Sequence, residues 1–202
     1  MKPGIRIIAG NLGGRVIHTF KDDLSVRPLL GRIKKSIFDI LYPRLKLGPA
    51  FLDLYAGTGN VGIEALSRGA KRVLFIDGDN KCVQLIKRNL QELGWEDPDA
   101  VRRGDITAGL KWLGEKFDII YMGPPYKDQD KRPLALTGTT LKIVVESGIM
   151  NPGAWIISQK HIKEPVIAPP ELEKFREEKY GDTLVSFYRT RPAVNRPESE
   201  NV

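Results

Sequence analysis

The chain has 202 residues, of which 41% are apolar and 28% charged, and this composition is typical of a single globular domain. No apolar run approaches the roughly 20 residues of a membrane-spanning helix, and the N-terminus has too short an apolar segment for a signal peptide. A single cysteine, Cys82, excludes an intramolecular disulfide and a multi-cysteine metal site, so we expect a cytoplasmic protein without a bound metal.

The net charge of +7 is concentrated in the first quarter of the chain. Residues 1–46 contain ten lysines and arginines and three aspartates, which gives +7, so the remainder is neutral. A basic segment attached to a neutral body is typical of proteins that bind nucleic-acid phosphates. A solvated face that only keeps the protein soluble fits the charge equally well.

The first elements form a small N-terminal unit. The sequence IRIIAGNLGGRVIHTF predicts a β-hairpin, because its glycines fall where a turn requires a positive φ. A helix is expected over residues 29–42, ended by Pro43. Its apolar stripe contains Ile33 and leaves Lys34 and Lys35 exposed.

From residue 50 onwards, apolar strands alternate with amphipathic helices. This alternation predicts a parallel sheet covered by helices on both faces. Residues 175–190 contain two strands around a Gly-Asp turn, so the last strand is expected to be antiparallel. The strands before them are expected at residues 50–57, 71–77, 100–105, 117–122 and 153–160, and the helices at 60–69, 80–94 and 140–148.

The stretch DLYAGTGNVG connects the first of these strands to its helix. Its glycines Gly57, Gly59 and Gly62 have the spacing G-x-G-x-x-G, which lets a ligand lie against the backbone. The spacing fits a dinucleotide site, with Asp77 about 20 residues further on for a ribose, and it also fits a turn that binds nothing. Asp53 argues against a dinucleotide, because a carboxylate at the strand end would repel a pyrophosphate and suit a cationic ligand.

S-adenosylmethionine fits the acidic residues better, because it has a sulfonium, an amine, a ribose and an adenine but no phosphate. Asp53 would face the amine, Asp77 the ribose and Asp105 the adenine amine. Each of these carboxylates could instead cap a helix or lie on the surface.

The segment MGPPY follows the expected strand at 117–122. In an open α/β sheet the carboxyl ends of the strands face the ligand. Pro124 and Pro125 would form a rigid extended corner, and Tyr126 would offer a flat ring to a base. Taken alone, the segment could equally be a proline-rich turn in which Tyr126 covers the sheet edge.

In this order, the motifs resemble the S-adenosylmethionine-dependent methyltransferases that modify exocyclic amines of bases. RIIAGNLGGRVI, VRPLLGRIKKSIFDIL and FLDLYAGTGNVGIEALSRGAKRVLFID are similar to the bacterial RsmD-type family, which methylates the 2-amino group of one guanine in 16S ribosomal RNA. The resemblance is almost continuous from Arg6 to Tyr126 and weaker to about residue 190.

This resemblance implies an α/β fold of the Rossmann-like class I methyltransferase type. The sheet would be mostly parallel and seven-stranded with its last strand antiparallel, preceded by an N-terminal β-hairpin and helix. The expected organisation is a basic RNA-facing extension at 1–46, a methyltransferase domain at 47–190 and a disordered tail at 191–202. The expected partner is ribosomal RNA in the small subunit, bound by a monomer.

The resemblance also assigns roles to individual residues. S-adenosylmethionine would be held by Asp53, Tyr55, Ala56, Gly57, Gly59, Asp77, Asp105 and Ile106. The target base would be received by Gly123, Pro124, Pro125 and Tyr126. RNA phosphates would be contacted by Arg6, Arg15, Arg27, Arg32, Lys34 and Lys35.

Gly123 departs from the family, which usually has aspartate at this position. The lone pair of a base amine is delocalised, so acceptors must hold its N–H groups, and glycine leaves only backbone carbonyls to do so. Loss of the charged acceptor could cost on the order of 10²–10³ in rate. The protein could then be a slow enzyme that Gly123→Asp would accelerate, or Asp128 or Asp130 could substitute, or methyl transfer could be absent.

Two other functions compete with guanine methylation. A DNA or RNA adenine methyltransferase would share the Pro-Pro-Tyr segment, but the chain is short and shows no separate target-recognition region. A non-catalytic RNA-binding ribosome-assembly factor would explain the loss of the acid at Gly123.

Overall fold

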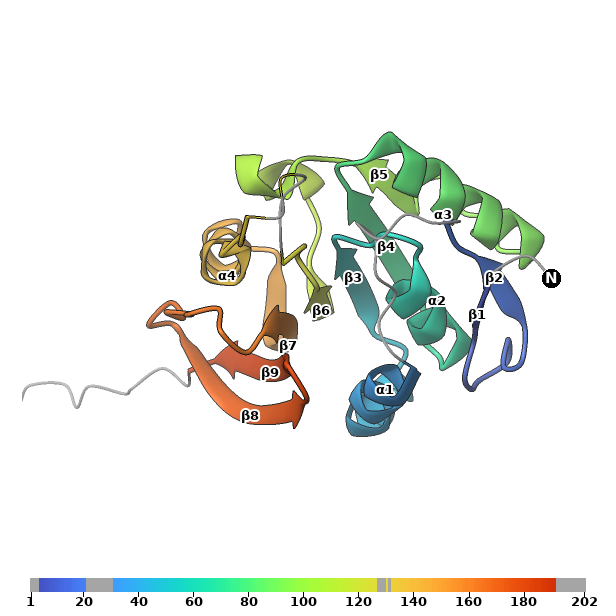
Figure 1. Cartoon of the computed structure of the whole chain (residues 1–202). Helices are drawn as coiled ribbons and strands as arrows, with labels where there is room; N and C mark the ends of the chain where they lie inside the picture. Colours follow the sequence, from blue (N-terminus) through green and yellow to red (C-terminus); the bar gives the residue numbers. More distant parts are fainter. Residues whose placement is uncertain (1–3, 21–30, 127–129, 131, 192–202) are drawn as a thin grey trace, which may run out of the picture.

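A computed structural model describes residues 4–20, 31–126, 130 and 132–191. Within these residues a seven-stranded sheet has the order β5-β4-β3-β6-β7-β9-β8, as Figure 1 shows. Its strands are β3 (Ala50–Leu54), β4 (Arg72–Asp77), β5 (Val101–Arg103), β6 (Phe117–Met122), β7 (Met150–His161), β8 (Leu172–Tyr180) and β9 (Thr183–Thr190). A separate hairpin consists of β1 (Gly4–Arg6) and β2 (Val16–His18).

The direction of the strands confirms the expected fold. The pairs β5–β4, β4–β3, β3–β6 and β6–β7 are parallel, whereas β9 is antiparallel to both β7 and β8. Gly181, with a φ of 60°, provides the left-handed residue in the tight turn that joins β8 to β9. The mostly parallel sheet with an antiparallel last strand was therefore predictable from the chain alone.

The helices are α1 (Gly31–Leu45), α2 (Asn60–Ser67), α3 (Asn80–Glu92) and α4 (Leu136–Glu146), and two 3₁₀ turns are η1 (Ile106–Ala108) and η2 (Lys111–Leu113). Helices cover both faces of the sheet, and each face has its own apolar core. The core on one face joins the hairpin, α1, α2 and α3 to the sheet through residues such as Phe51 and Phe75. The core on the other face joins α4 and two short 3₁₀ turns to residues such as Leu52 and Leu74. Figure 1 shows the hairpin beside α3, at the other end of the molecule from β8 and β9.

Helix α1 extends further than expected. Pro43 was predicted to end it, but the helix continues to Leu45. A proline in the last turn removes a single backbone hydrogen bond, and the extra turn buries Leu45 completely beside Leu41. Burial of that apolar stripe therefore outweighs the missing bond. None of the helices in the described part of the chain is long and apolar enough to cross a membrane.

The prediction that Lys34 is exposed is wrong. Its side chain is buried, and its Nζ lies 2.9 Å from Glu64 Oε2 and 2.7 Å from Asn60 Oδ1. Glu64 is fully buried in α2, and a buried carboxylate requires a cationic partner. Lysine meets this need because its apolar stem lies within the helix stripe while its ammonium reaches the acid. Lys34 is therefore unavailable to RNA, whereas Lys35 is exposed as expected.

The same carboxylate attaches the N-terminal hairpin to the body of the protein. Glu64 accepts hydrogen bonds from the backbone N–H groups of Ile8 at 2.9 Å and Ala9 at 3.1 Å. Burial alone would raise the pKa of Glu64, but the bond from Ile8 N and the nearby Lys34 and Arg68 lower it. Ser67 adds a further connection, since its hydroxyl accepts from Leu12 N at 3.0 Å. A single buried acid thus joins the hairpin, α1 and α2.

Close packing between α2 and β4 depends on Gly62. A Cβ atom at this position would lie 2.2 Å from Cε1 of Phe75. We expect Gly62→Ala to lower the free energy of unfolding by about 1–3 kcal/mol, because the core must open to admit the methyl group. Urea unfolding of this variant measures the effect. Gly31→Ala is the matched control, since a Cβ there meets nothing within 4 Å, and equal stability of the two variants would contradict the packing.

Candidate functional site

The topology brings the predicted site segments together at one edge of the sheet. Strands β5, β4, β3 and β6 are adjacent and parallel, so the segments that follow them meet at their carboxyl ends. The register pairs Asp53 of β3 with Tyr121 of β6 and with Phe75 of β4. The glycine loop, Asp77 and the segment from Gly123 therefore share this edge.

The loop between β3 and α2 has a constrained backbone. Tyr55 has a φ of 58°, and among the described residues it is the one non-glycine with a positive φ. Gly57 and Gly59 are also left-handed, at 56° and 78°. The Tyr55 hydroxyl lies 2.8 Å from Thr140 Oγ1 on α4, which holds the ring in place. Strained residues of this kind concentrate at functional sites, because the surrounding structure must hold them.

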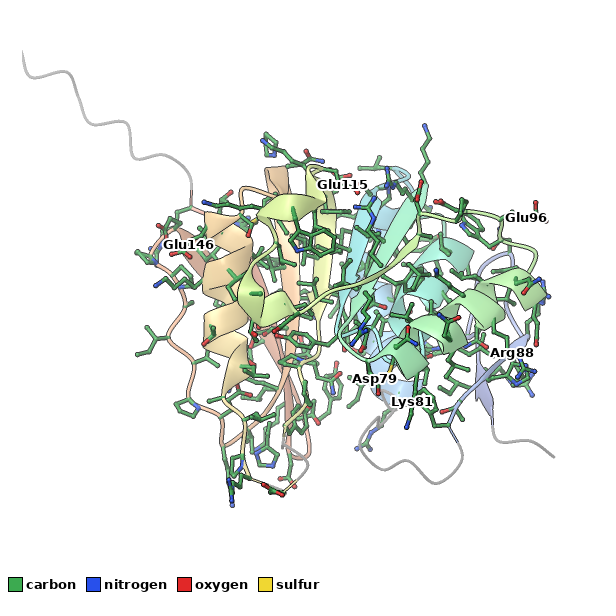
Figure 2. All side chains as sticks on the ribbon, turned by 90° about the horizontal axis from the view of Figure 1, so that it is seen from above. Asp79, Lys81, Arg88, Glu96, Glu115 and Glu146 are labelled. Atoms are coloured by element: carbon green, nitrogen blue, oxygen red, sulfur yellow. The ribbon has the colours of Figure 1, made fainter. Side chains whose placement is uncertain are left out.

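Asp77 connects the glycine loop to the start of α3. One carboxylate oxygen accepts from Gly57 N at 2.8 Å, and the other accepts from Asp79 N at 2.8 Å. Asp79 in turn caps α3 by accepting from Lys81 N at 2.8 Å. Figure 2 shows Asp79 and Lys81 at this end of α3, away from Arg88. Burial raises the pKa of Asp77, although its hydrogen bonds with Asp79, Gly57 and Cys82 oppose the shift.

Only one of the two carboxylate oxygens of Asp53 has a hydrogen-bond partner within the described part of the protein. The side chain is 1% exposed, and its Oδ2 accepts from Gly62 N at 2.8 Å. Its Oδ1 is buried and has no hydrogen-bond partner. Burial raises the pKa of Asp53 well above its usual range, and the charge of Asp77 adds to the shift. An unpaired buried carboxylate oxygen beside a glycine loop suits a ligand that brings a cationic amine.

Asp105 and Ile106 follow β5. Asp105 caps η1, because one carboxylate oxygen accepts from Thr107 N at 2.9 Å and from Thr107 Oγ1 at 2.6 Å. These hydrogen bonds lower its pKa, and its side chain remains exposed. Burial raises the pKa of Tyr55, and the charge of Asp105 adds to the shift. Ile106 is buried in the core beneath α4.

The Gly-Pro-Pro-Tyr segment continues from β6. Pro124 is buried, Pro125 is exposed and Tyr126 is half-buried. The Tyr126 hydroxyl accepts from Gln159 Nε2 at 2.9 Å, and its ring meets His161 edge-on with centroids 5.9 Å apart. This ring is therefore held on one side by β7.

The two acids considered as substitutes for an aspartate at position 123 have different outcomes. Asp130 is exposed and lies 3.7 Å from Arg132, with no hydrogen bond or ion pair to the Gly-Pro-Pro-Tyr segment among the described residues. Asp128 lies outside the described residues. The hydroxyl of Tyr121, which is not among the predicted site residues, lies 3.2 Å from the place that a Cβ on Gly123 would take. The alternation of side chains along a strand could have indicated Tyr121, because it lies two residues before Gly123 and residues at that spacing share a face of the sheet.

Two of the predicted RNA contacts on the hairpin are engaged within the protein. One guanidinium nitrogen of Arg6 donates to Gly14 O at 2.8 Å. Arg15 donates to Leu93 O at 3.2 Å and to Glu92 O at 2.7 Å, at the C-terminal end of α3. Cations at such an end satisfy free carbonyls and interact favourably with the helix dipole. Both side chains remain exposed.

The basic residues around α1 have three different environments. Arg32 is exposed and has no hydrogen-bond or ion-pair partner among the described residues. Lys35 is exposed and lies 2.7 Å from Asp39 one turn later. Lys34 is buried, and Arg27 lies outside the described residues. The bond from Lys34 to Asn60 places the first turn of α1 beside the glycine loop.

The chain is similar to known proteins in family, sequence and structure. The family model described as "Conserved hypothetical protein 95" matches residues 5–189. The chain is 33% identical over 192 residues to YlbH of Bacillus subtilis, a protein to which its name ascribes rRNA methyltransferase activity, and the match covers 93% of this chain and 100% of that one. The chain is also 27% identical over 191 residues to "Ribosomal RNA small subunit methyltransferase D" of Haemophilus influenzae, which covers 93% and 95% of the two chains.

The fold has a close counterpart among solved structures. The Escherichia coli protein yhhF, described as a methyltransferase, superposes with a TM-score of 0.77 at 25% sequence identity. The superposition covers 93% of this chain and 98% of that chain. The family match likewise begins in the N-terminal hairpin and ends in the last strand of the sheet.

Proposed function

Because this chain belongs to the RsmD-type methyltransferase family, we propose that it transfers a methyl group from S-adenosylmethionine to the 2-amino group of a guanine in 16S ribosomal RNA of the small subunit. Relatives over nearly the whole chain carry names that specify methylation of small-subunit ribosomal RNA. The observation that carries the proposal within this chain is the unpaired, buried Oδ1 of Asp53 beside the glycine loop.

The residues at this edge fit S-adenosylmethionine. Asp53 would accept from its ammonium group, which supplies the positive charge that the buried carboxylate lacks. Asp77 would accept from the ribose hydroxyls while its existing bonds keep the glycine loop in place. Asp105 and Ile106 would lie toward the adenine. When bound, this cofactor supplies an electrophilic methyl carbon on a sulfonium centre.

The segment from Gly123 to Tyr126 would receive the target base. A base inside an RNA stack must be flipped out before its amine can react, and an aromatic ring commonly holds it. The Tyr126 ring, fixed by Gln159, would stack on the base. A backbone carbonyl of this segment would accept one N–H bond from its amine, so that a fixed acceptor orients the nitrogen.

The RNA backbone would dock on the exposed basic side of α1. We expect Arg32→Glu combined with Lys35→Glu to weaken RNA binding. The slope of the logarithm of the binding constant against the logarithm of the salt concentration should become less steep by about 2, because each lost phosphate contact reduces this slope by about 1. Filter binding across a salt series measures both quantities.

Lys142→Glu is the matched control for this surface. Lys142 lies on α4 and, like Lys35, is exposed with an acidic partner four residues later, Glu146. Figure 2 shows Glu146 on the opposite side of the molecule from α3. Equal losses in the double variant and the control would contradict docking at α1.

Labelled methyl transfer tests the proposed function. The substrates are unmodified small-subunit particles, free 16S RNA and duplex DNA, each supplied with S-adenosylmethionine. We expect incorporation into ribosomal RNA and none into DNA. Transfer to DNA alone would favour the adenine-directed alternative, and bound cofactor without any transfer would favour a non-catalytic assembly factor.

A further inference from the structure

A line of hydrogen bonds runs beneath Gly123 from β6 to β7. The hydroxyl of Tyr121 donates to Gln159 Oε1 at 2.6 Å. The amide nitrogen of the same glutamine donates to the Tyr126 hydroxyl at 2.9 Å. Asp53 is the register partner of Tyr121 on the neighbouring strand. The buried phenol thus lies between the half-satisfied carboxylate of the glycine loop and the ring that ends the Pro-Pro-Tyr segment.

The direction of these bonds determines what the Tyr121 oxygen can still do. Its one proton is used by Gln159, so only lone pairs remain. A group fixed in this way is a preorganised acceptor. Burial raises the pKa of Tyr121 well above its usual range, and the charge of Asp53 adds to the shift, so the hydroxyl stays protonated and the bond to Gln159 persists.

Because residue 123 is a glycine, no side chain at this position covers the phenol oxygen of Tyr121. A Cβ on this glycine would lie 3.2 Å from the Tyr121 oxygen and 3.4 Å from its Cε1. The oxygen therefore borders the space that a side chain at position 123 would enter. Any larger side chain at Gly123 and the hydroxyl of Tyr121 compete for the same volume.

We infer that the Tyr121 hydroxyl oxygen accepts an N–H of the target amine through the opening at Gly123, in place of a side-chain acceptor at that position. Gln159 is a positioning residue, because it orients the Tyr121 proton away from the amine and holds Tyr126 at the same time. The inference rests on the proposed function for the identity of the amine. It also explains how a glycine can stand where an acceptor is needed.

The first experiment compares guanosine and inosine monophosphate, which differ by the 2-amino group. Each nucleotide is titrated against the protein saturated with S-adenosylhomocysteine, so the result does not depend on methyl transfer. We expect the wild-type protein to prefer guanosine, and Tyr121→Phe to reduce this preference roughly tenfold, the value of one hydrogen bond. A general loss of structure would weaken the binding of both nucleotides equally and leave the ratio of their dissociation constants unchanged.

The second experiment combines Tyr121→Phe with Gly123→Asp. In the single Gly123→Asp variant the new side chain meets the phenol, so we expect a lower unfolding midpoint. In the double variant the hydroxyl is absent, so we expect both the midpoint and the preference for guanosine to recover. An unchanged preference in Tyr121→Phe, or a wild-type protein that does not distinguish the two nucleotides, would overturn the inference. A protein that prefers guanosine but transfers no methyl group would contradict only the proposed function.

Discussion

Replacing Lys34 with methionine is expected to lower the free energy of unfolding by about 3 kcal/mol, because it leaves a buried acid with one cation fewer. The Lys34 ammonium lies 2.9 Å from Glu64 Oε2 and also donates to Arg6 O at 3.1 Å. Burial lowers the pKa of Lys34, although Glu64 opposes this shift. Chemical denaturation of the purified protein measures the loss.

Lys35→Met is the matched control for this prediction. Lys35 is the next residue on the same helix, and its pair with Asp39 is exposed. Exposed pairs of this kind contribute about 0–1 kcal/mol, so the control should be close to wild type. Similar stability of Lys34→Met and Lys35→Met would contradict the burial of Lys34. Lys34→Glu is unsuitable as an RNA-binding probe, because it would place a second acid against Glu64.

Asp53→Asn is expected to abolish measurable binding of S-adenosylmethionine and, at the same time, to stabilise the ligand-free protein at neutral pH. The amide can still accept from Gly62 N, but it carries no charge for an ammonium. It also removes a buried carboxylate whose Oδ1 lacks a partner. Calorimetric titration measures binding, and thermal unfolding measures stability.

The sign of the pH dependence follows from the raised pKa of Asp53. Above the usual pKa of an aspartate, the unfolded chain has released a proton that the folded protein still holds, so stability falls as the pH rises. The fall continues until the pH passes the raised pKa of the folded protein. Asp53→Asn should remove this decline. Asp79→Asn is the control, because asparagine caps a helix as well as aspartate does, and the idea fails if the two variants bind cofactor equally.

The order of strands and helices could be read from the sequence, because the spacing of apolar residues along the chain differs between a strand and a helix. The strands before Asp77 and Gly123 are short apolar runs, and the helices between them are amphipathic. Parallel strands end at the same edge, so these residues had to meet there. The antiparallel last strand was readable as well, because Gly181 marks the turn between two adjacent strands.

The burial of Lys34 could not be read from the helix pattern. Its partner Glu64 lies 30 residues further along the chain, on another helix, and neither residue is apolar. The hydrogen bond between Tyr121 and Gln159 could not be read from the sequence either, because it depends on the register of β6 and β7. Local patterns describe the face of one element, whereas pairing between elements depends on how they pack.

The most direct test of the central claim is the identity of the methylated nucleoside. Small-subunit RNA that has been treated with the protein and labelled S-adenosylmethionine is digested to nucleosides and analysed by mass spectrometry. The account predicts a single labelled product, guanosine methylated on its 2-amino group. Label in methyladenosine, or RNA without label while the cofactor binds, would contradict it.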